Sequence, residues 1–359
     1  MKKFLFLVCL SLFSQFVCAQ FNGNGFYRVQ NTGTKRYLTV VDHRASVNMA
    51  TTDPDLAAIL PIRSFERIVG NPGSVIYIYQ SGTSDYSLRA QGVDSYDLMG
   101  VYLNLRKLGD GSYYAYARAQ GMTKYLYDED SRRDEGWLMT KGVYRNWNII
   151  PLNSSSDNYF GVLPEIEHNG SFYTTMYAAF PYKSVSSDTR MYYAELVRRD
   201  VAVLKEIKDN FVPAATAVII KCSSSNASDN RLDVFASGGS AVTGNCLGGV
   251  YFDNDNKTHW NRLAYDPNTM RVLGVMKDGS LGFITADLDY LPANKAYLKV
   301  PAGSPEEIRL ISEDDYATGV EFVPSADNNS LSFFDLSGRK VVNPGCGIYI
   351  SCNGKKFCR

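Results

Sequence analysis

The sequence has few of the residues on which catalysis most often depends, and it carries no excess of charge. Its three histidines, His43, His168 and His259, fall in different regions. No G-x-S-x-G elbow or comparable nucleophile turn accompanies them. Basic and acidic residues balance at 37 each, so no net field attracts a polyanion. We therefore expect no nucleic-acid partner, no enzymatic activity and no cofactor.

Long apolar runs are also missing, apart from one at the amino end. The stretch Phe4 to Phe16 follows Lys2 and Lys3 and precedes Val17-Cys18-Ala19. It falls short of the roughly 20 residues that a membrane span requires. We predict a signal peptide over residues 1–19, no transmembrane span, and a secreted or outer-surface location. A lipid anchor on Cys18 is the alternative, to which Val17 is a poor match.

Cysteine is scarce after the predicted signal: Cys222, Cys246, Cys346, Cys352 and Cys358 remain. Cys222 and Cys246 flank a Ser/Asn/Gly-rich stretch, where a disulfide would stabilise the fold by roughly 3 kcal/mol. Two free thiols fit the sequence equally well. The last three cysteines match no common zinc spacing, so we expect no metal.

Aromatic residues are plentiful, at 13% of the chain, and most are Tyr and Phe. Together with many Gly, Ser, Asn and Asp turn residues they favour strands over helices. We therefore expect an all-β protein. A chain of 359 residues is long enough for two or three domains.

A pattern of aromatic strand, polar turn and second strand occurs three times near the amino end. The runs are Phe26 to Val40, Val75 to Ala90 and Tyr113 to Asp128. Each unit is too small to bury its own apolar face, so the three must close against one another. This predicts one domain over residues 20–152.

The first and last motifs of this region resemble those of the ricin-type β-trefoil lectins. The resemblance rests on Gly25-Phe26-Tyr27-Arg28-Val29, on Lys35-Arg36-Tyr37-Leu38 and on Trp147-Asn148-Ile149. It implies a β-trefoil that binds carbohydrate at shallow sites without catalysis. Where sugar-binding members carry an Asp after the Leu, this chain has Thr39, Arg89 and Tyr127.

Other acidic and aromatic residues follow the second strands and are candidates to replace the missing carboxylates. An aromatic ring stacks on a sugar's apolar face, while a carboxylate accepts hydrogen bonds worth about 1 kcal/mol each from its hydroxyls. Capping of turns explains these residues equally well. The candidate ligand-binding residues are Asp42, His43, Asp94, Tyr96, Asp128 and Asp130.

A Ser-rich joint at Asn153 to Asn158 begins a second region, which we place at residues 153–312. Phe211 to Cys222 and Tyr290 to Pro301 share a pattern about 79 residues apart, which predicts a duplicated, β-sandwich-like unit. Within this region, Met191 to Ile207 fits either a helical face or a hairpin. Its Tyr and Val content favours the hairpin.

The tail, residues 313–359, has the pattern of two β-hairpins, Ser332 to Val342 and Gly347 to Phe357. It resembles the C-terminal β segment by which many bacterial proteins are sorted across the outer membrane. A packing hairpin of the second region is the alternative.

Three functions remain open. The first is a non-catalytic bacterial carbohydrate-binding protein whose partner is a polysaccharide or glycoprotein. The second is a structural or protein-interaction module with a cell-envelope protein partner. The third is a glycoside hydrolase, which requires two carboxylates; the paired acids are Glu165 and Glu167.

Overall fold

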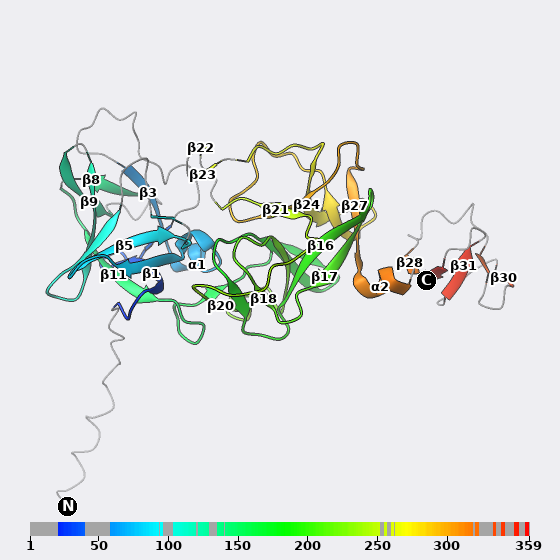
Figure 1. Cartoon of the computed structure of the whole chain (residues 1–359), viewed down its shortest axis with the longest axis horizontal. Helices are drawn as coiled ribbons and strands as arrows, with labels where there is room; N and C mark the ends of the chain where they lie inside the picture. The colour runs from blue at the N-terminus through cyan, green and yellow to red at the C-terminus, as the bar shows by residue number, and fades with distance from the viewer. Residues whose placement is uncertain are drawn as a thin grey trace, which may run out of the picture.

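The computed structural model describes residues 21–39, 58–92, 94–95, 103–119, 121–128, 135–139, 141–251, 255–256, 260–261, 263–318, 320–322, 333–334, 339–341, 348–351 and 356–358. Strands dominate, beside the short helices α1 (Phe65–Ile68), η2 (Pro72–Ser74) and α2 (Glu313–Thr318). The expected all-β fold is confirmed. Figure 1 shows three parts in chain order: a blue and cyan barrel, a green and yellow middle region, and a red C-terminal sheet.

Eleven strands form the sheet of the amino-terminal part. They are β1 (Gly25–Asn31), β2 (Tyr37–Leu38), β3 (Ala58–Arg63), β4 (Ile76–Gln80), β5 (Asp85–Ala90), β6 (Asp94–Ser95), β7 (Asn104–Lys107), β8 (Tyr113–Ala119), β9 (Met122–Tyr127), β10 (Glu135–Met139) and β11 (Asn146–Pro151).

Six of these strands close into a ring. Strand β1 pairs with β4, β4 with β5, β5 with β7, β7 with β8, β8 with β11, and β11 with β1. Side chains two apart on each strand point inward, as the pleat requires. The barrel core includes Tyr27 and Val29, Ile76 and Ile78, Tyr86 and Leu88, Leu103 and Leu105, Tyr113 and Ala115, and Trp147 and Ile149.

One end of the barrel is filled by Phe21. Its ring lies 5.7 Å from that of Tyr27 and 4.6 Å from that of Tyr86, centroid to centroid. Its backbone N–H donates to the Tyr113 hydroxyl at 3.4 Å. The three tyrosines come from β1, β5 and β8, which alternate around the ring of strands, so Phe21 contacts all three of these strands through its ring and its backbone.

The structure corrects the position of the second sequence repeat relative to the strands of the barrel. The runs beginning at Phe26 and at Tyr113 each contain one ring strand and one strand outside the ring, β1 with β2 and β8 with β9. The run Val75 to Ala90 instead contains two consecutive ring strands, β4 and β5. Strands β4 and β5 carry an alternation of aromatic and aliphatic residues like that of β1, so a hairpin that joins two units resembles one within a unit.

The middle region contains a sheet of four strands and one of ten. The four are β12 (Phe160–Gly161), β15 (Tyr182–Ser184), β18 (Phe211–Val212) and β20 (Arg231–Val234). The ten are β13 (Ile166–His168), β14 (Ser171–Met176), β16 (Arg190–Arg198), β17 (Val201–Glu206), β19 (Val218–Cys222), β21 (Leu247–Gly249), β24 (Met270–Val275), β25 (Leu281–Ile284), β26 (Ala296–Lys299) and β27 (Glu307–Ser312). A separate pair, β22 (Asp255–Asn256) with β23 (Trp260–Asn261), completes the region.

The large sheet repeats its own pairing register. Its order is β13-β14-β19-β16-β17-β27-β25-β24-β26-β21, so β14-β19-β16-β17 forms one set of four on one side of β27, with β13 at its edge, and β25-β24-β26-β21 forms a second set on the other side. Tyr193 faces Lys205 in the first set, and Val272 faces Ile284, each 79 positions later, in the second. This is the spacing of the two sequence motifs. The hairpin predicted for Met191 to Ile207 is confirmed as β16 and β17.

The barrel packs tightly on the middle region through Arg28 of β1, which is fully buried. Its guanidinium donates to the carbonyls of Val69 at 3.1 Å and Tyr159 at 2.7 Å, and to Asn158 Oδ1 at 3.1 Å. Burial lowers its pKa to about 9, so Arg28 remains charged at neutral pH. Val75 and Phe160 share one buried cluster, so the two parts have a common core.

The C-terminal sheet lies beyond α2, at the opposite end from the barrel (Figure 1). Its strands are β28 (Val320–Phe322), β29 (Phe333–Phe334), β30 (Lys340–Val341), β31 (Ile348–Ser351) and β32 (Lys356–Cys358). The antiparallel pairs β29 with β30 and β31 with β32 confirm the two expected hairpins. Among the described residues, no helix is both long and apolar enough to span a bilayer.

Candidate functional site

Most of the predicted sugar-binding residues lie where the structure gives no side-chain description. Asp42, His43, Tyr96 and Asp130 fall outside the described residues. Asp94 belongs to β6, and its backbone pairs with Ala90 of β5. The hypothesis of shallow sites beside these residues therefore stays a prediction.

Asp128 is described, and it is fully buried. Its carboxylate forms an ion pair with Arg36, in which Arg36 Nε donates to Asp128 Oδ2 at 3.1 Å. The Thr34 hydroxyl donates to the same carboxylate. These bonds join the start of the barrel to its last unit, so Asp128 serves the fold and is not accessible to an external sugar.

The expected disulfide between Cys222 and Cys246 is not formed, because both thiols are free. Cys222 packs in the same cluster as Ile220, whereas Cys246 packs beside Ile219 on the other face of the sheet. The sheet thus separates the two sulfurs. Burial raises the pKa of Cys222 to about 12, so its thiol is protonated at neutral pH.

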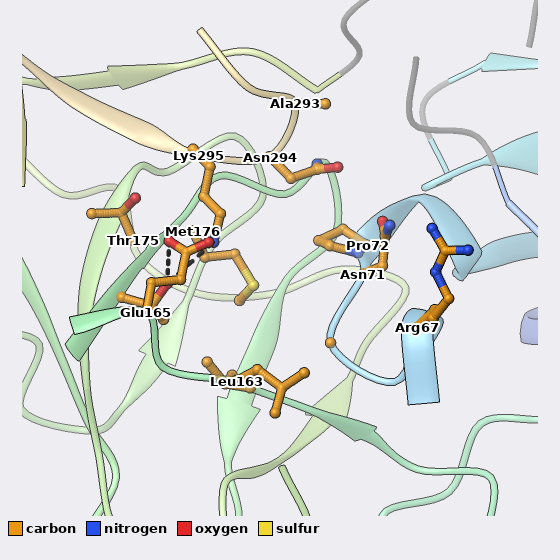
Figure 2. Close-up of a pocket in the computed structure, with 13 residues that line it drawn as sticks. Arg67, Asn71, Pro72, Leu163, Glu165, Thr175, Met176, Ala293, Asn294 and Lys295 are labelled. Atoms are coloured by element: carbon orange, nitrogen blue, oxygen red, sulfur yellow. Dashed lines mark hydrogen bonds and ion pairs between the residues drawn. The ribbon is translucent and has the colours of Figure 1, made fainter. Parts of the chain in front are cut away.

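A cavity of about 330 Å³ lies where the barrel meets the middle region. Figure 2 shows its two walls, with Arg67, Asn71 and Pro72 on one side and Glu165, Thr175 and Lys295 on the other. Its full lining is Arg67, Gly70, Asn71, Pro72, Val162, Leu163, Glu165, Thr174, Thr175, Met176, Ala293, Asn294 and Lys295. We call it the junction cavity.

The barrel wall of the junction cavity is set by a short capped turn. Asn71 precedes η2, and its side-chain oxygen accepts a hydrogen bond from the Gly73 N–H at 2.9 Å. Pro72 occupies the first helical position, where a missing N–H costs nothing. A Cβ on Gly70 would come within 2.7 Å of the Gly161 carbonyl oxygen, so glycine permits this approach of the two regions.

The opposite wall is set by the turn before β26. Asn294 has φ of 62°, a left-handed conformation that asparagine tolerates better than most residues. Its side-chain N–H groups donate to the Tyr177 carbonyl at 2.9 Å and to Gln91 Oε1 at 3.2 Å. Because Gln91 belongs to the barrel, this buried amide pair ties the wall to the barrel and presents the next residue, Lys295, to the cavity.

Three side chains form a polar cluster in this wall. Lys295 Nζ lies 2.8 Å from Glu165 Oε1 and 3.1 Å from Thr174 Oγ1, and Thr174 Oγ1 lies 3.2 Å from Glu165 Oε2. The side chains of Glu165 and Lys295 keep 55% and 30% of their exposure. Such a pair contributes about 0–1 kcal/mol to stability, so its atoms can exchange partners with a ligand.

A second cavity of about 170 Å³ adjoins the first across this cluster. The two share Glu165, Thr174, Thr175 and Lys295. Beyond the cluster the second cavity is apolar, with Leu273, Leu288, Leu291 and Pro292 in its lining. A ligand with both hydroxyl groups and an apolar face fits this combination.

The two copies of the duplicated motif differ at the turn that lines the cavity. Pro213-Ala214-Ala215-Thr216 corresponds to Pro292-Ala293-Asn294-Lys295. Ala215 has φ of 58°, nearly the value for Asn294, so the backbone is the same in both copies. Where the first copy has Ala215 and Thr216, the second has Asn294 and the charged Lys295.

Of the two acids proposed for hydrolysis, only Glu165 lines the junction cavity; Glu167 is an exposed residue of β13. Glycoside hydrolysis uses two carboxylates across the scissile bond. Among the residues that line the two cavities, Glu165 is the single carboxylate. No group of three or more potential metal ligands occurs in the described residues. The arrangement is therefore suited to hydrogen bonding of a ligand.

Sequence reasoning identified Glu165 but missed Asn71, Asn294 and Lys295. The available signal was the difference between the copies, Ala-Thr in one against Asn-Lys in the other at matched positions. Asn71 gave no such signal, since it reads as an ordinary helix cap.

No known protein family model matches this chain, and no curated protein is significantly similar to it.

Proposed function

We propose that this protein binds carbohydrate without catalysis and that the junction cavity is its principal ligand site. The observation that carries the proposal is the cluster of Glu165, Thr174 and Lys295, whose two charged side chains are partly exposed between a polar and an apolar cavity. Cavities between domains are common ligand sites.

The chemistry of the cluster matches a neutral sugar. The Glu165 carboxylate accepts hydrogen bonds from ring hydroxyls, and the Lys295 ammonium donates to them. The Thr174 hydroxyl both donates and accepts, whereas the Thr175 hydroxyl is bonded to the backbone of Ala296. Leu163, Met176 and Pro72 supply apolar contact for the C–H face of the ring (Figure 2). A lone carboxylate holds such a ligand but lacks the second acid that hydrolysis requires.

The barrel supports the same proposal through its likeness to the ricin-type lectins. A closed ring of six strands, with the alternating strands β1, β5 and β8 built alike, agrees with a β-trefoil. We extend the proposal to the location: an exported protein, at the bacterial surface or outside it, with the C-terminal sheet as its sorting segment.

A protein-interaction module is the second candidate function, and one observation favours it. Asp128 is the predicted sugar-binding residue whose side chain the structure describes. Its carboxylate is bonded to Arg36 and Thr34 inside the barrel. The barrel then serves as a rigid support. A pull-down from envelope extracts that recovers one protein partner, unaffected by free sugars, selects this alternative.

The experiment is a glycan array with the whole mature chain, residues 20–359, because the barrel shares core contacts with the middle region. We expect binding to a restricted set of neutral oligosaccharides. In the double variant E165Q/K295M we expect at least about tenfold weaker binding, since two charge-assisted hydrogen bonds are lost.

The matched control is K277M/E306Q. Lys277 and Glu306 form an ion pair of the same kind, at 3.2 Å, outside both cavity linings. Unchanged binding in the control and loss in the cavity variant support the proposal. No glycan binding, or equal binding by both variants, contradicts it.

A further inference from the structure

A continuous row of outward side chains crosses five strands on the outside of the barrel. Tyr79 of β4 faces Ser87 of β5, Ser87 faces Asn104 of β7, Asn104 faces Tyr116 of β8, and Tyr116 faces Tyr125 of β9. We call these five residues the tyrosine row. All five are half-buried, whereas their neighbours Ile78, Leu88 and Leu105 point into the core.

The row has the length and the chemistry of a site for an extended chain. Strand spacing of about 4.8 Å makes it about 19 Å long from first to last residue. Two hydrogen-bonding side chains lie between its tyrosines, Ser87 and Asn104, and the Ser87 hydroxyl donates to Asn104 Oδ1 at 3.1 Å. A polymer that lies along the row meets one ring, then two polar groups, then two rings.

Three arginines flank the row, each stacked on a tyrosine. The guanidinium carbons lie 5.1 Å from the ring of Tyr79 for Arg89, 5.2 Å from that of Tyr116 for Arg106, and 5.7 Å from that of Tyr114 for Arg145. Tyr114 itself contacts Tyr125, with ring centroids 5.1 Å apart. Stacking holds a guanidinium plane in place while its N–H edges stay open to a ligand.

The charge of this surface is unbalanced. Arg106 is paired with Asp85 through bonds of 2.7 and 3.2 Å. Arg89 and Arg145 are exposed, and neither has a hydrogen bond or ion pair within the described residues. Three guanidinium groups with one carboxylate leave an excess of positive charge beside the row.

We propose that the tyrosine row and its arginines form a second binding surface, for an acidic polysaccharide whose carboxylates pair with Arg89 and Arg145. This surface shares no residue with the junction cavity. Ser87 and Asn104 suit the hydroxyls of a uronate chain, while the chain as a whole has no net charge to attract nucleic acid. Planar guanidinium groups bind carboxylates in a bidentate manner.

The test measures binding of the whole mature chain to polygalacturonate, with its methyl ester as the uncharged form of the same polymer. We expect binding to polygalacturonate that weakens as salt is added, and at least about tenfold weaker binding to the ester. In R89M/R145M the affinity falls by at least about tenfold. The matched control R190M/K277M removes the same charge from exposed sites in the middle region and leaves the affinity unchanged.

A gain of affinity separates the proposal from misfolding. D85N removes the carboxylate that occupies Arg106, so we expect it to bind polygalacturonate more tightly than the unaltered chain. Equal binding of the ester, unaltered affinity in R89M/R145M, or stronger binding to a single-stranded DNA of similar length overturns the proposal. E165Q/K295M alters only the junction cavity, so failure of one site can be told from failure of the other.

Discussion

The guanidinium of Arg36 and the carboxylate of Asp128 form a buried ion pair across 92 positions of the sequence. The pair links the outer hairpin of the first barrel unit to that of the last. Both side chains are nearly inaccessible, at 10% and 0% exposure, so the bond joins parts of the fold and contributes nothing to a surface site.

For D128N we predict a free energy of unfolding that is lower by roughly 3 to 5 kcal/mol, because Arg36 keeps a buried charge without its partner. Urea denaturation measures the change. The control is R190M, which breaks an exposed pair with Glu206 and costs less than about 1 kcal/mol. If D128N were as stable as the unaltered chain but lost glycan binding, the carboxylate would belong to a ligand site after all.

A second prediction concerns Arg28, whose buried guanidinium bonds to both regions. R28M leaves the carbonyl of Tyr159 and Oδ1 of Asn158 without the donor that Arg28 supplies, at about 1 to 3 kcal/mol for each. We expect calorimetry to show two separate transitions in R28M where the unaltered chain unfolds in one. A single transition at an unchanged temperature would show that Arg28 does not couple the two regions.

The thiols provide a third prediction. Both Cys222 and Cys246 should react with a thiol reagent once the chain is unfolded without reductant, and Cys222 should be protected in the folded chain because it is buried. Failure of both to react after unfolding would show that they are oxidised.

The Cys222 thiol also makes stability depend on pH. Folding raises the pKa of this thiol from 9.0 to about 12. Between these two pH values the thiol is deprotonated in the unfolded chain and still protonated in the folded chain. The unfolded state is then favoured as pH rises, and stability falls across this window. In C222A the free energy of unfolding should fall less steeply over this pH range. Parallel curves of free energy against pH for C222A and the unaltered chain would contradict the assignment of this pH dependence to Cys222.

The duplicated turn provides a fourth prediction. Ala215 holds φ of 58°, which costs a residue with a Cβ about 1 to 2 kcal/mol. Asn occupies the matching position in the second copy, so A215N should raise the free energy of unfolding by about 1 kcal/mol. The neighbouring change A214N, at a residue without positive φ, should not stabilise the chain. The denaturant concentration at the midpoint of unfolding, measured for A215N and A214N, tests this prediction.

Local pattern was enough to predict much of the fold. Alternation in Tyr193, Glu195 and Val197 outweighed a helical interpretation, because β16 pairs with a strand directly after it in sequence. The 79-residue echo likewise located two strand sets with the same register. Both signals lie within short stretches of sequence.

Long-range contacts were harder to predict. Arg36 and Asp128 meet only when the barrel closes, so the sequence predicted Asp128 as a ligand-binding residue or a turn cap and gave no sign of its ion pair. The sequence Arg-Ala-Gln-Gly occurs at residues 89–92 and again at 118–121, and it marks where the second repeat corresponds to the third. The stronger aromatic pattern of Val75 to Ala90 obscured this correspondence. The junction cavity combines segments more than 200 positions apart, and only the folded chain brings Asn71 toward Lys295.

The most direct test of the central claim is a crystal structure of residues 20–359 with the best neutral oligosaccharide from the array. We predict that the sugar lies in the junction cavity, with hydroxyls bonded to Glu165 and Lys295 and its apolar face toward Leu163 and Met176. A sugar bound elsewhere on the protein, with the junction cavity empty of it, would contradict the account.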